Sequence, residues 1–166
     1  DLRHALEQNE FRLYYQPQFS GDGKRLTGAE ALLRWQHPQR GLVPPNDFIP
    51  VLEELGLVVQ VGDWVLREAC RQLAEWQEAN IRVPKISVNL SARQFAEGDL
   101  HQRIAQILEL SGISAGCLEL ELTESILMED VANAMHTLSS LKELGVFIAI
   151  DDFGTGYSSL NYLKQF

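Results

Sequence analysis

Cysteine is scarce in this sequence of 166 residues: Cys70 and Cys117 are the only two, and they lie far apart. So few thiols exclude a disulfide framework and favour a reducing environment. No apolar run approaches the roughly 18 residues that a membrane-spanning helix needs, and the first residues lack the charged-then-apolar pattern of a secretory signal. We therefore expect a cytoplasmic domain, or the cytoplasmic part of a membrane-anchored protein, with no membrane contact by this segment.

Positive charge is also limited, because 14 Lys and Arg residues stand against 23 Asp and Glu residues, for a formal net charge of −9. This balance excludes non-specific binding to a nucleic acid polymer or to anionic lipid, which requires basic patches. An acidic protein can still bind a small anion where metal ions reverse the local field. With 45% hydrophobic residues, the chain is expected to form one folded domain rather than a disordered segment.

Several catalytic motifs are absent. The sequence has no GxxxxGK[ST] phosphate loop, no CxxC pair and no recognisable Ser/His/Asp set, and its four histidines lack the spacing of metal ligands. Any chemistry is therefore expected to depend on carboxylates.

The apolar pattern that is present predicts alternating strands and helices. We expect an antiparallel pair of strands first, a loop over 37–46, and from residue 89 onward the strand–helix alternation of a parallel sheet with right-handed crossovers. The expected strands span 11–19, 25–35, 85–90, 117–123 and 146–152. The expected helices span 1–10, 48–55, 64–79 after a cap at Asp63, 99–110, a segment from a cap at Asp130 to a stop at Gly145, and 158–166.

Polar residues recur where these strands end. Asp151 and Asp152 follow an apolar strand and precede a glycine-rich turn, and Asn89, Glu121 and Asp151 are separated by 32 and 30 positions. A (β/α)8 barrel of about 250 residues averages roughly 31 residues per unit and carries its chemistry at the carboxyl ends of the strands. Adjacent buried carboxylates are costly without a positive partner. Together with Glu30 in the second strand, they predict an all-oxygen site for a hard divalent cation.

Each of these residues also has a plainer interpretation, which the sequence leaves open. The alternatives are solvent exposure of Glu119 and Glu121 on an edge strand, an ion pair of Glu30 with Arg34, a turn at 91–93 capped by Asn89, and a helix cap at Asp151 and Asp152. The coincidence of four oxygen ligands in phase at strand ends favours the metal site.

Five motifs carry a resemblance to a known family. They are YYQP at 14–17, EALLRW at 30–35, NLS at 89–91, ELTES at 121–125 and DDFGTGYSSL at 151–160. The string EAL means little alone, but the ordered set is specific. It resembles the EAL domain family of cyclic di-GMP phosphodiesterases over the whole chain.

The resemblance implies an α/β fold, a modified TIM (β/α)8 barrel with an antiparallel first strand. Residues 1–166 would be an EAL domain truncated before its C-terminal third, with about the first five strands. The family's KID-type lysine, EGVE-type glutamate and final glutamine are absent from this sequence, and Lys164 precedes the expected place of the lysine. This chain alone is therefore expected to be inactive.

The resemblance also implies roles for individual residues. Glu30, Asn89, Glu121 and Asp151 resemble the ligands of one metal, and Asp151 with Asp152 those of a second; Glu30, Asp151 and Asp152 would be catalytic. Substrate contacts are implied for Gln16, Leu32 and Arg34. Glu124 resembles a glutamate that anchors the loop Phe153–Ser159, which the family uses for dimerisation.

The implied function is hydrolysis of cyclic di-GMP to linear pGpG with two Mg²⁺ or Mn²⁺ ions, inhibited by Ca²⁺. A homodimer through the loop at Phe153–Ser159 and an upstream sensor or GGDEF domain are the expected partners. Two alternatives stay open: a catalytically inactive EAL domain that acts as a cyclic di-GMP receptor or protein-interaction module, and a structural half-barrel that swaps or assembles.

Overall fold

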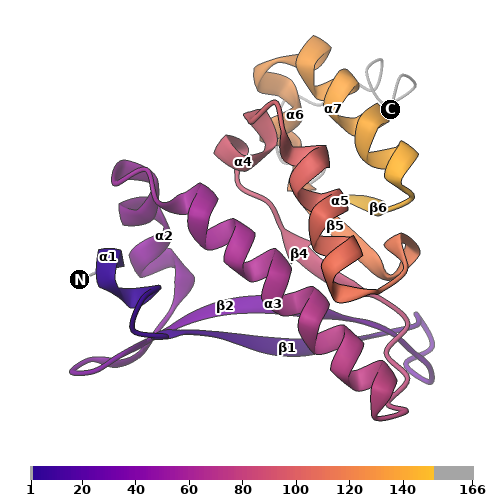
Figure 1. Ribbon diagram of the computed structural model, residues 1–166, viewed down its shortest axis with the longest axis horizontal. Helices are drawn as coiled ribbons and strands as arrows, with labels where there is room; N and C mark the ends of the chain where they lie inside the picture. Colours follow the sequence, from indigo (N-terminus) through magenta and orange to yellow (C-terminus); the bar gives the residue numbers. More distant parts are fainter. Residues whose placement is uncertain (1, 152–166) are drawn as a thin grey trace.

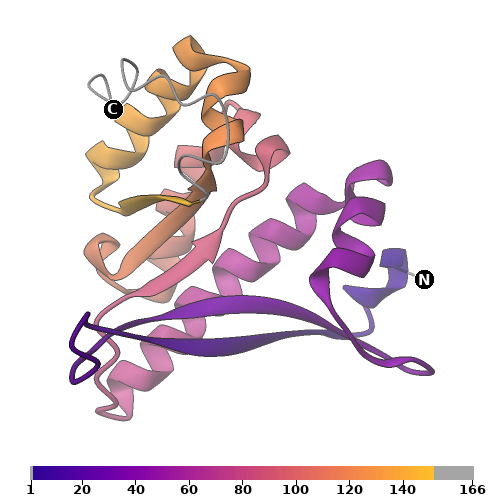
Figure 2. The same cartoon turned by 180° about the vertical axis from the view of Figure 1, so that it is seen from behind.

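The computed structural model describes residues 2–151, and these form a sheet with helices packed on one face (Figures 1 and 2). The strands are β1 (Phe11–Phe19), β2 (Leu26–His37), β3 (Gly41–Val43), β4 (Ile86–Asn89), β5 (Leu118–Thr123) and β6 (Phe147–Asp151). The helices are α1 (Leu2–Ala5), α2 (Pro45–Glu54), α3 (Val58–Glu78), α4 (Ala92–Ala96), α5 (Leu100–Ser111), α6 (Glu124–Glu129) and α7 (Val131–Leu144).

The strand order is β1-β2-β4-β5-β6, with β3 paired to β2. β1 runs antiparallel to β2, whereas β2, β4, β5 and β6 pair in parallel. Both features were predicted: the antiparallel first pair, and the parallel sheet that follows from strand–helix alternation. The chain thus has the α/β topology of the first strands of a barrel.

Alternation along the strands separates two faces of the sheet. On β5, Leu118, Leu120 and Leu122 are buried, while the glutamates between them are only partly buried. The buried leucines form one core with Ile86 and Val88 of β4 and with the apolar side of α3. Burying each such side chain contributes about 2 kcal/mol. This packing fixes which residues of β2, β4, β5 and β6 point away from the helices.

Two predicted helix boundaries are confirmed on α7. The Asp130 side chain accepts a hydrogen bond of 3.1 Å from the backbone N–H of Asn133, and Gly145 ends the helix at a φ of 88°. The left-handed conformation at Gly145 is one that glycine adopts without a steric penalty.

Other boundaries were predicted wrongly. α3 begins at Val58, so Asp63 lies inside the helix, where its Oδ2 accepts a bond of 3.2 Å from Arg103. The expected loop at 37–46 contains β3, and α1 ends at Ala5 rather than at residue 10. α4 and α6 were not predicted. The expected helix over 158–166 lies outside the described residues.

Candidate active site

Strand register brings the predicted ligands to one face of the sheet. Asn89 on β4 is level with Glu121 on β5, Glu30 on β2 is level with Ser87, and Asp151 on β6 is level with Thr123. Because residues two apart on a strand share a face, Glu30, Asn89, Glu121 and Asp151 all lie on the side opposite the helices. We call this side the ligand face.

Glu30 and Asn89 are in direct contact. The Asn89 amide Nδ2 donates a hydrogen bond of 2.8 Å to Oε1 of Glu30. Arg34 instead donates to the carbonyl of Leu33 at 2.8 Å, and among the described residues it forms no ion pair with Glu30. The cap that follows β4 is Ser91, whose hydroxyl accepts from the backbone of Gln94. The interpretation of Glu30 as an ion-pair partner of Arg34 is therefore wrong. The interpretation of Asn89 as the cap of a turn at 91–93 is also wrong.

Glu121 is half-buried on the ligand face, and its pKa lies above the ordinary value for glutamate. Burial is the main cause, the negative charge of Glu30 adds to it, and the polar hydroxyl of neighbouring Ser87 opposes it. Glu119 and Asp151 raise the pKa further. Burial and the neighbouring carboxylates thus both disfavour the ionised form of Glu121, and a bound cation would offset that penalty.

Glu119 does not face solvent on an edge strand, since β5 is paired on both sides. Its Oε2 lies 2.5 Å from Nζ of Lys85, and its Oε1 accepts a bond of 2.8 Å from the buried Ser87 hydroxyl. The solvent alternative is thus wrong for Glu119. Sequence reasoning missed Lys85 and Ser87, although both alternate in phase with Asn89.

The chemistry of the donor set suits a divalent cation. Three carboxylates and one amide supply only oxygen ligands, as Mg²⁺ and Mn²⁺ prefer, and the charge around Glu121 calls for a positive partner. In the arrangement seen over residues 2–151, no three Asp, Glu, His or Cys side chains stand close enough together to hold an ion. The residues fit a metal by chemistry and by shared face, whereas Asp152, predicted as a second-metal ligand, lies outside the described residues.

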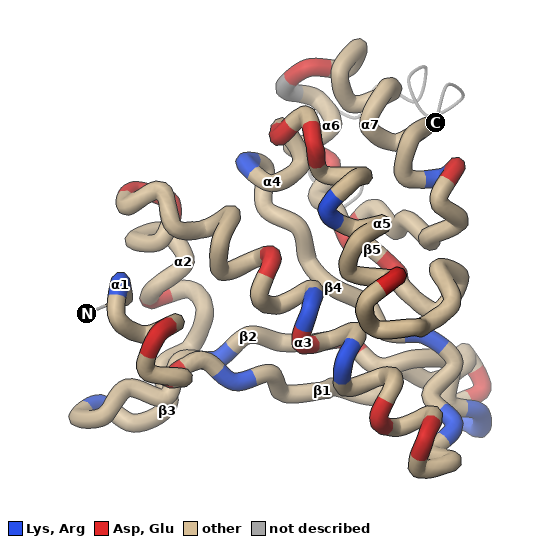
Figure 3. Tube along the Cα trace, viewed as in Figure 1, with Lys and Arg blue, Asp and Glu red and all other residues tan. Residues whose placement is uncertain are grey.

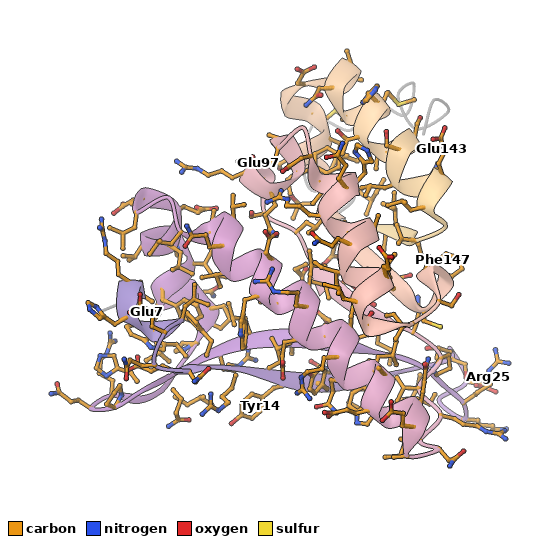
Figure 4. All side chains as sticks on the ribbon, viewed as in Figure 1. Glu7, Tyr14, Arg25, Glu97, Glu143 and Phe147 are labelled. Carbon is orange, nitrogen blue, oxygen red and sulfur yellow. The ribbon has the colours of Figure 1, made fainter. Side chains whose placement is uncertain are left out.

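The predicted substrate contacts share the ligand face. Gln16 is level with Glu30 across the β1–β2 pair, Leu32 with Tyr14, and Arg34 with Arg12. Tyr15, which follows Tyr14 on β1, points to the helix side of the sheet and packs against Trp76 with ring centroids 4.9 Å apart. Tyr14 is 49% exposed (Figure 4). Gln16, Leu32 and Arg34 therefore border an open surface beside Glu30.

A mainly apolar cavity of about 520 Å³ adjoins this surface. Leu32 and Asn89 contribute to its wall, together with residues of α2, α3, α4 and α6. Among the residues that line this cavity, Leu32 is a predicted substrate contact and Asn89 a predicted metal ligand.

Comparison with protein families matches residues 1–166 to the family described as EAL domain. The chain belongs to the EAL domain family. It is 47% identical over 165 residues to the bifunctional diguanylate cyclase/cyclic di-GMP phosphodiesterase MucR of Pseudomonas aeruginosa, covering 99% of this chain and 24% of MucR. It is 43% identical over 162 residues to the oxygen sensor protein DosP of Escherichia coli, covering 98% of this chain and 20% of DosP.

Solved structures of EAL domains agree with this fold. The MucR phosphodiesterase in complex with c-di-GMP superposes with a TM-score of 0.95 at 47% identity, covering 99% of this chain and 67% of the other. The FimX EAL domain of Pseudomonas aeruginosa bound to c-di-GMP gives 0.88 at 29% identity, covering 99% and 65%. This chain therefore spans a quarter or less of these two curated relatives and about two thirds of the solved domains.

Two further properties bear on this EAL domain. The family is metal-dependent. Between residues 2 and 151, none of the helices combines the length and apolar character needed to cross a bilayer.

Glu124, the predicted loop anchor of this EAL domain, is the first residue of α6 and is only 8% exposed. A buried acid at the start of a helix is favoured by the helix dipole. The loop at 153–159 lies outside the described residues, so the anchoring role stays a prediction.

Proposed function

We propose that this EAL domain takes part in hydrolysis of cyclic di-GMP to linear pGpG. One observation carries the proposal: Glu30, Asn89, Glu121 and Asp151 share one face of a parallel sheet, on adjacent strands. The kinship with MucR, which is described as a cyclic di-GMP phosphodiesterase, supports this choice of substrate.

Glu30, Asn89, Glu121 and Asp151 would hold one Mg²⁺ or Mn²⁺ ion, and Asp151 with Asp152 a second. Bound there, such ions lower the pKa of a water and stabilise negative charge on the phosphodiester. Residues of the chain orient the proposed ligands before an ion binds. Asn89 holds the Glu30 carboxylate through its 2.8 Å hydrogen bond.

The substrate would be oriented from β1 and β2. Arg34 offers a guanidinium to a phosphate oxygen, in a geometry that suits bidentate binding. Gln16 presents an amide on the same face. Leu32 and the adjoining apolar cavity would cover an apolar face of the nucleotide and limit the access of water.

We further propose that residues 1–166 act as the N-terminal two thirds of a catalytic domain, joined to an upstream sensor or GGDEF domain and dimerised through the loop at 153–159. The coverage of 67% of the solved MucR domain supports the first part. MucR is described as a bifunctional diguanylate cyclase/cyclic di-GMP phosphodiesterase and DosP as an oxygen sensor protein, which supports a further domain in the full-length protein.

The test is an assay of the full-length protein with cyclic di-GMP and Mn²⁺, following pGpG by chromatography. We expect turnover that is lost in Glu30→Gln. A receptor would bind cyclic di-GMP without forming pGpG, and that result would overturn the proposal. The hydrolase is favoured because the relative described as a phosphodiesterase is 47% identical and the predicted ligands are all present in the sequence.

A further inference from the structure

An ion pair lies on the ligand face beside the predicted ligands. Lys85, Ser87 and Asn89 alternate along one side of β4 and the residue before it, and Glu119 and Glu121 do the same on β5. Figure 3 marks the acidic residues of β5 in red. Lys85 Nζ lies 2.5 Å from Glu119 Oε2. Ser87, which is fully buried, donates to Glu119 Oε1 at 2.8 Å. Both carboxylate oxygens of Glu119 are therefore engaged.

Gly28 provides the space for this lysine. A Cβ at residue 28 would lie 2.8 Å from Cγ of Lys85 and 3.0 Å from its carbonyl oxygen. The same carbonyl accepts a bond of 3.0 Å from Ala29. The stem of Lys85 thus lies against the backbone of β2, and its side chain is only 28% exposed. The neighbouring strand is shaped to keep the ammonium group beside Glu119.

The Lys85–Glu119 ion pair lies close enough to the predicted metal ligands to affect metal binding. Glu119 and Glu121 are two residues apart on one strand, a separation of about 7 Å. Without Lys85, the Glu119 carboxylate would be a further negative charge beside Glu30 and Glu121, with oxygens able to reach towards a cation. Without Glu119, the Lys85 ammonium would be an unpaired positive charge beside the same ligands.

We propose that Lys85, assisted by Ser87, holds Glu119 as a carboxylate that does not ligate metal, and that this pair sets the cation affinity of the site formed by Glu30, Asn89, Glu121 and Asp151. The inference rests on the proposed metal-dependent function. Lys85 is a positioning residue: it acts on the ligands through Glu119 and touches no reacting atom.

A double-mutant cycle in the full-length protein tests this, with the Kd of Mn²⁺ measured by isothermal titration calorimetry. Glu119→Gln leaves Lys85 unpaired and should weaken Mn²⁺ binding about tenfold, because Coulomb interactions at such distances are only partly screened. Lys85→Met frees Glu119 and should tighten binding while lowering kcat, because the freed carboxylate competes as a ligand. The double variant Lys85→Met/Glu119→Gln has the same net charge as the unsubstituted protein. Its Kd for Mn²⁺ should return to within about twofold of the Kd of the unsubstituted protein.

The matched control is Arg71 with Glu75, an ion pair between exposed side chains of α3. Arg71→Met and Glu75→Gln should leave the Kd of Mn²⁺ unchanged. A general effect of charge or of stability would move it in these variants too.

The outcomes separate this inference from the proposed function. Failure of the unsubstituted protein to bind Mn²⁺ would overturn both. Binding by the unsubstituted protein with an unchanged Kd in Glu119→Gln would overturn the role of the ion pair alone. If the Kd of Mn²⁺ shifts in the same direction in both single variants and does not recover in the double variant, the pair has a structural role. That result would also overturn the inference. If Lys85→Met does not fold, Glu119→Gln decides the question, because glutamine keeps the shape of glutamate.

Discussion

The side-chain amide of Asn89 on β4 donates a hydrogen bond of 2.8 Å to the Glu30 carboxylate on β2, across 59 positions of sequence. An amide in this place can donate to one carboxylate through its nitrogen while its carbonyl oxygen stays available as a neutral ligand. Asn89 is uncharged, so its amide oxygen would add a metal ligand without adding charge repulsion between Glu30 and Glu121. This explains why an amide, rather than another acid, suits the strand between Glu30 and Glu121.

The first prediction concerns this contact. Asn89→Ala removes both the proposed ligand oxygen and the hydrogen bond to Glu30, so we expect a loss of about 100-fold in kcat or in Mn²⁺ affinity. Steady-state kinetics and calorimetry on the full-length protein measure the two effects. Asn133→Ala is the control, because Asn133 is exposed on α7 and contributes its backbone, not its side chain, to the helix cap. Full turnover in Asn89→Ala would exclude a role for the amide.

The second prediction concerns the stability of the metal-free protein. Burial, with Glu30 next, raises the pKa of Glu121 above 4.5. The folded state therefore binds this proton more tightly than the unfolded state, and the contribution of Glu121 to stability falls as the pH rises from 4.5 through the folded pKa. Glu121→Gln cannot ionise and so avoids this loss of stability. In EDTA at pH 7.5, the Tm of this variant should exceed that of the unsubstituted protein by a few degrees.

The difference in Tm should shrink as the pH is lowered towards 4.5. Thermal unfolding followed by circular dichroism over this range measures it. A lower Tm of Glu121→Gln at pH 7.5 would show that the carboxylate is already compensated without metal.

Much of the fold and of the site could be predicted because strand alternation is strict. Leu118, Leu120 and Leu122 are buried by their period of two, and the same period places Glu121 on the opposite face. Parallel strands then bring their carboxyl ends to one edge of the sheet. The common face of Glu30, Asn89, Glu121 and Asp151 therefore follows from local pattern and strand direction.

The start of α3 could not be predicted in this way. Gly62 followed by Asp63 has the appearance of a turn and a helix cap, but α3 begins at Val58. A Cβ at Gly62 would lie 2.0 Å from Nε2 of Gln94. The glycine therefore permits α4 to pack closely on α3, a tertiary requirement that has no local signal. The pairing of Lys85 with Glu119 depends likewise on strand register, which only the folded sheet fixes.

The third prediction concerns metal identity. The full-length protein should hydrolyse cyclic di-GMP with Mg²⁺ or Mn²⁺ and lose activity in excess EDTA. Ca²⁺ should inhibit, because it prefers more ligands at longer distances than an octahedral Mg²⁺ site offers. Titration of each ion into the metal-free protein, with pGpG as the readout, measures this. Turnover that survives complete chelation would contradict a metal-dependent mechanism.

The fourth prediction concerns Glu124. If this buried acid anchors the loop at 153–159, Glu124→Ala should speed amide hydrogen exchange in that loop and lower kcat, without changing the Mn²⁺ affinity of the first site. Exchange measured by mass spectrometry on the full-length protein tests the first effect. Glu143→Ala on α7, an exposed acid labelled in Figure 4, is the control. Unchanged exchange together with normal turnover would remove the anchoring role.

The last prediction separates two arginines that face each other across β1 and β2. Arg34 and Arg12 are directly opposite in register, and like charges so placed are mutually destabilising. The Arg12 guanidinium is held by the carbonyls of Asn9 and Phe11, whereas Arg34 contacts one carbonyl, that of Leu33, at 2.8 Å. Turning its guanidinium to a phosphate would cost Arg12 two such bonds and Arg34 only one.

Arg34→Ala should raise KM for cyclic di-GMP at least about tenfold, as expected for the loss of a charge-assisted bond, with a smaller effect on kcat. Arg12→Ala removes the same charge from the neighbouring strand and should change KM by less than about threefold. Because the two substitutions alter net charge equally, a difference between them reports contact with substrate rather than long-range attraction. Equal increases in KM at the same ionic strength would show that the β1–β2 pair acts only through its field, and the assignment of Arg34 as a direct phosphate contact would be wrong.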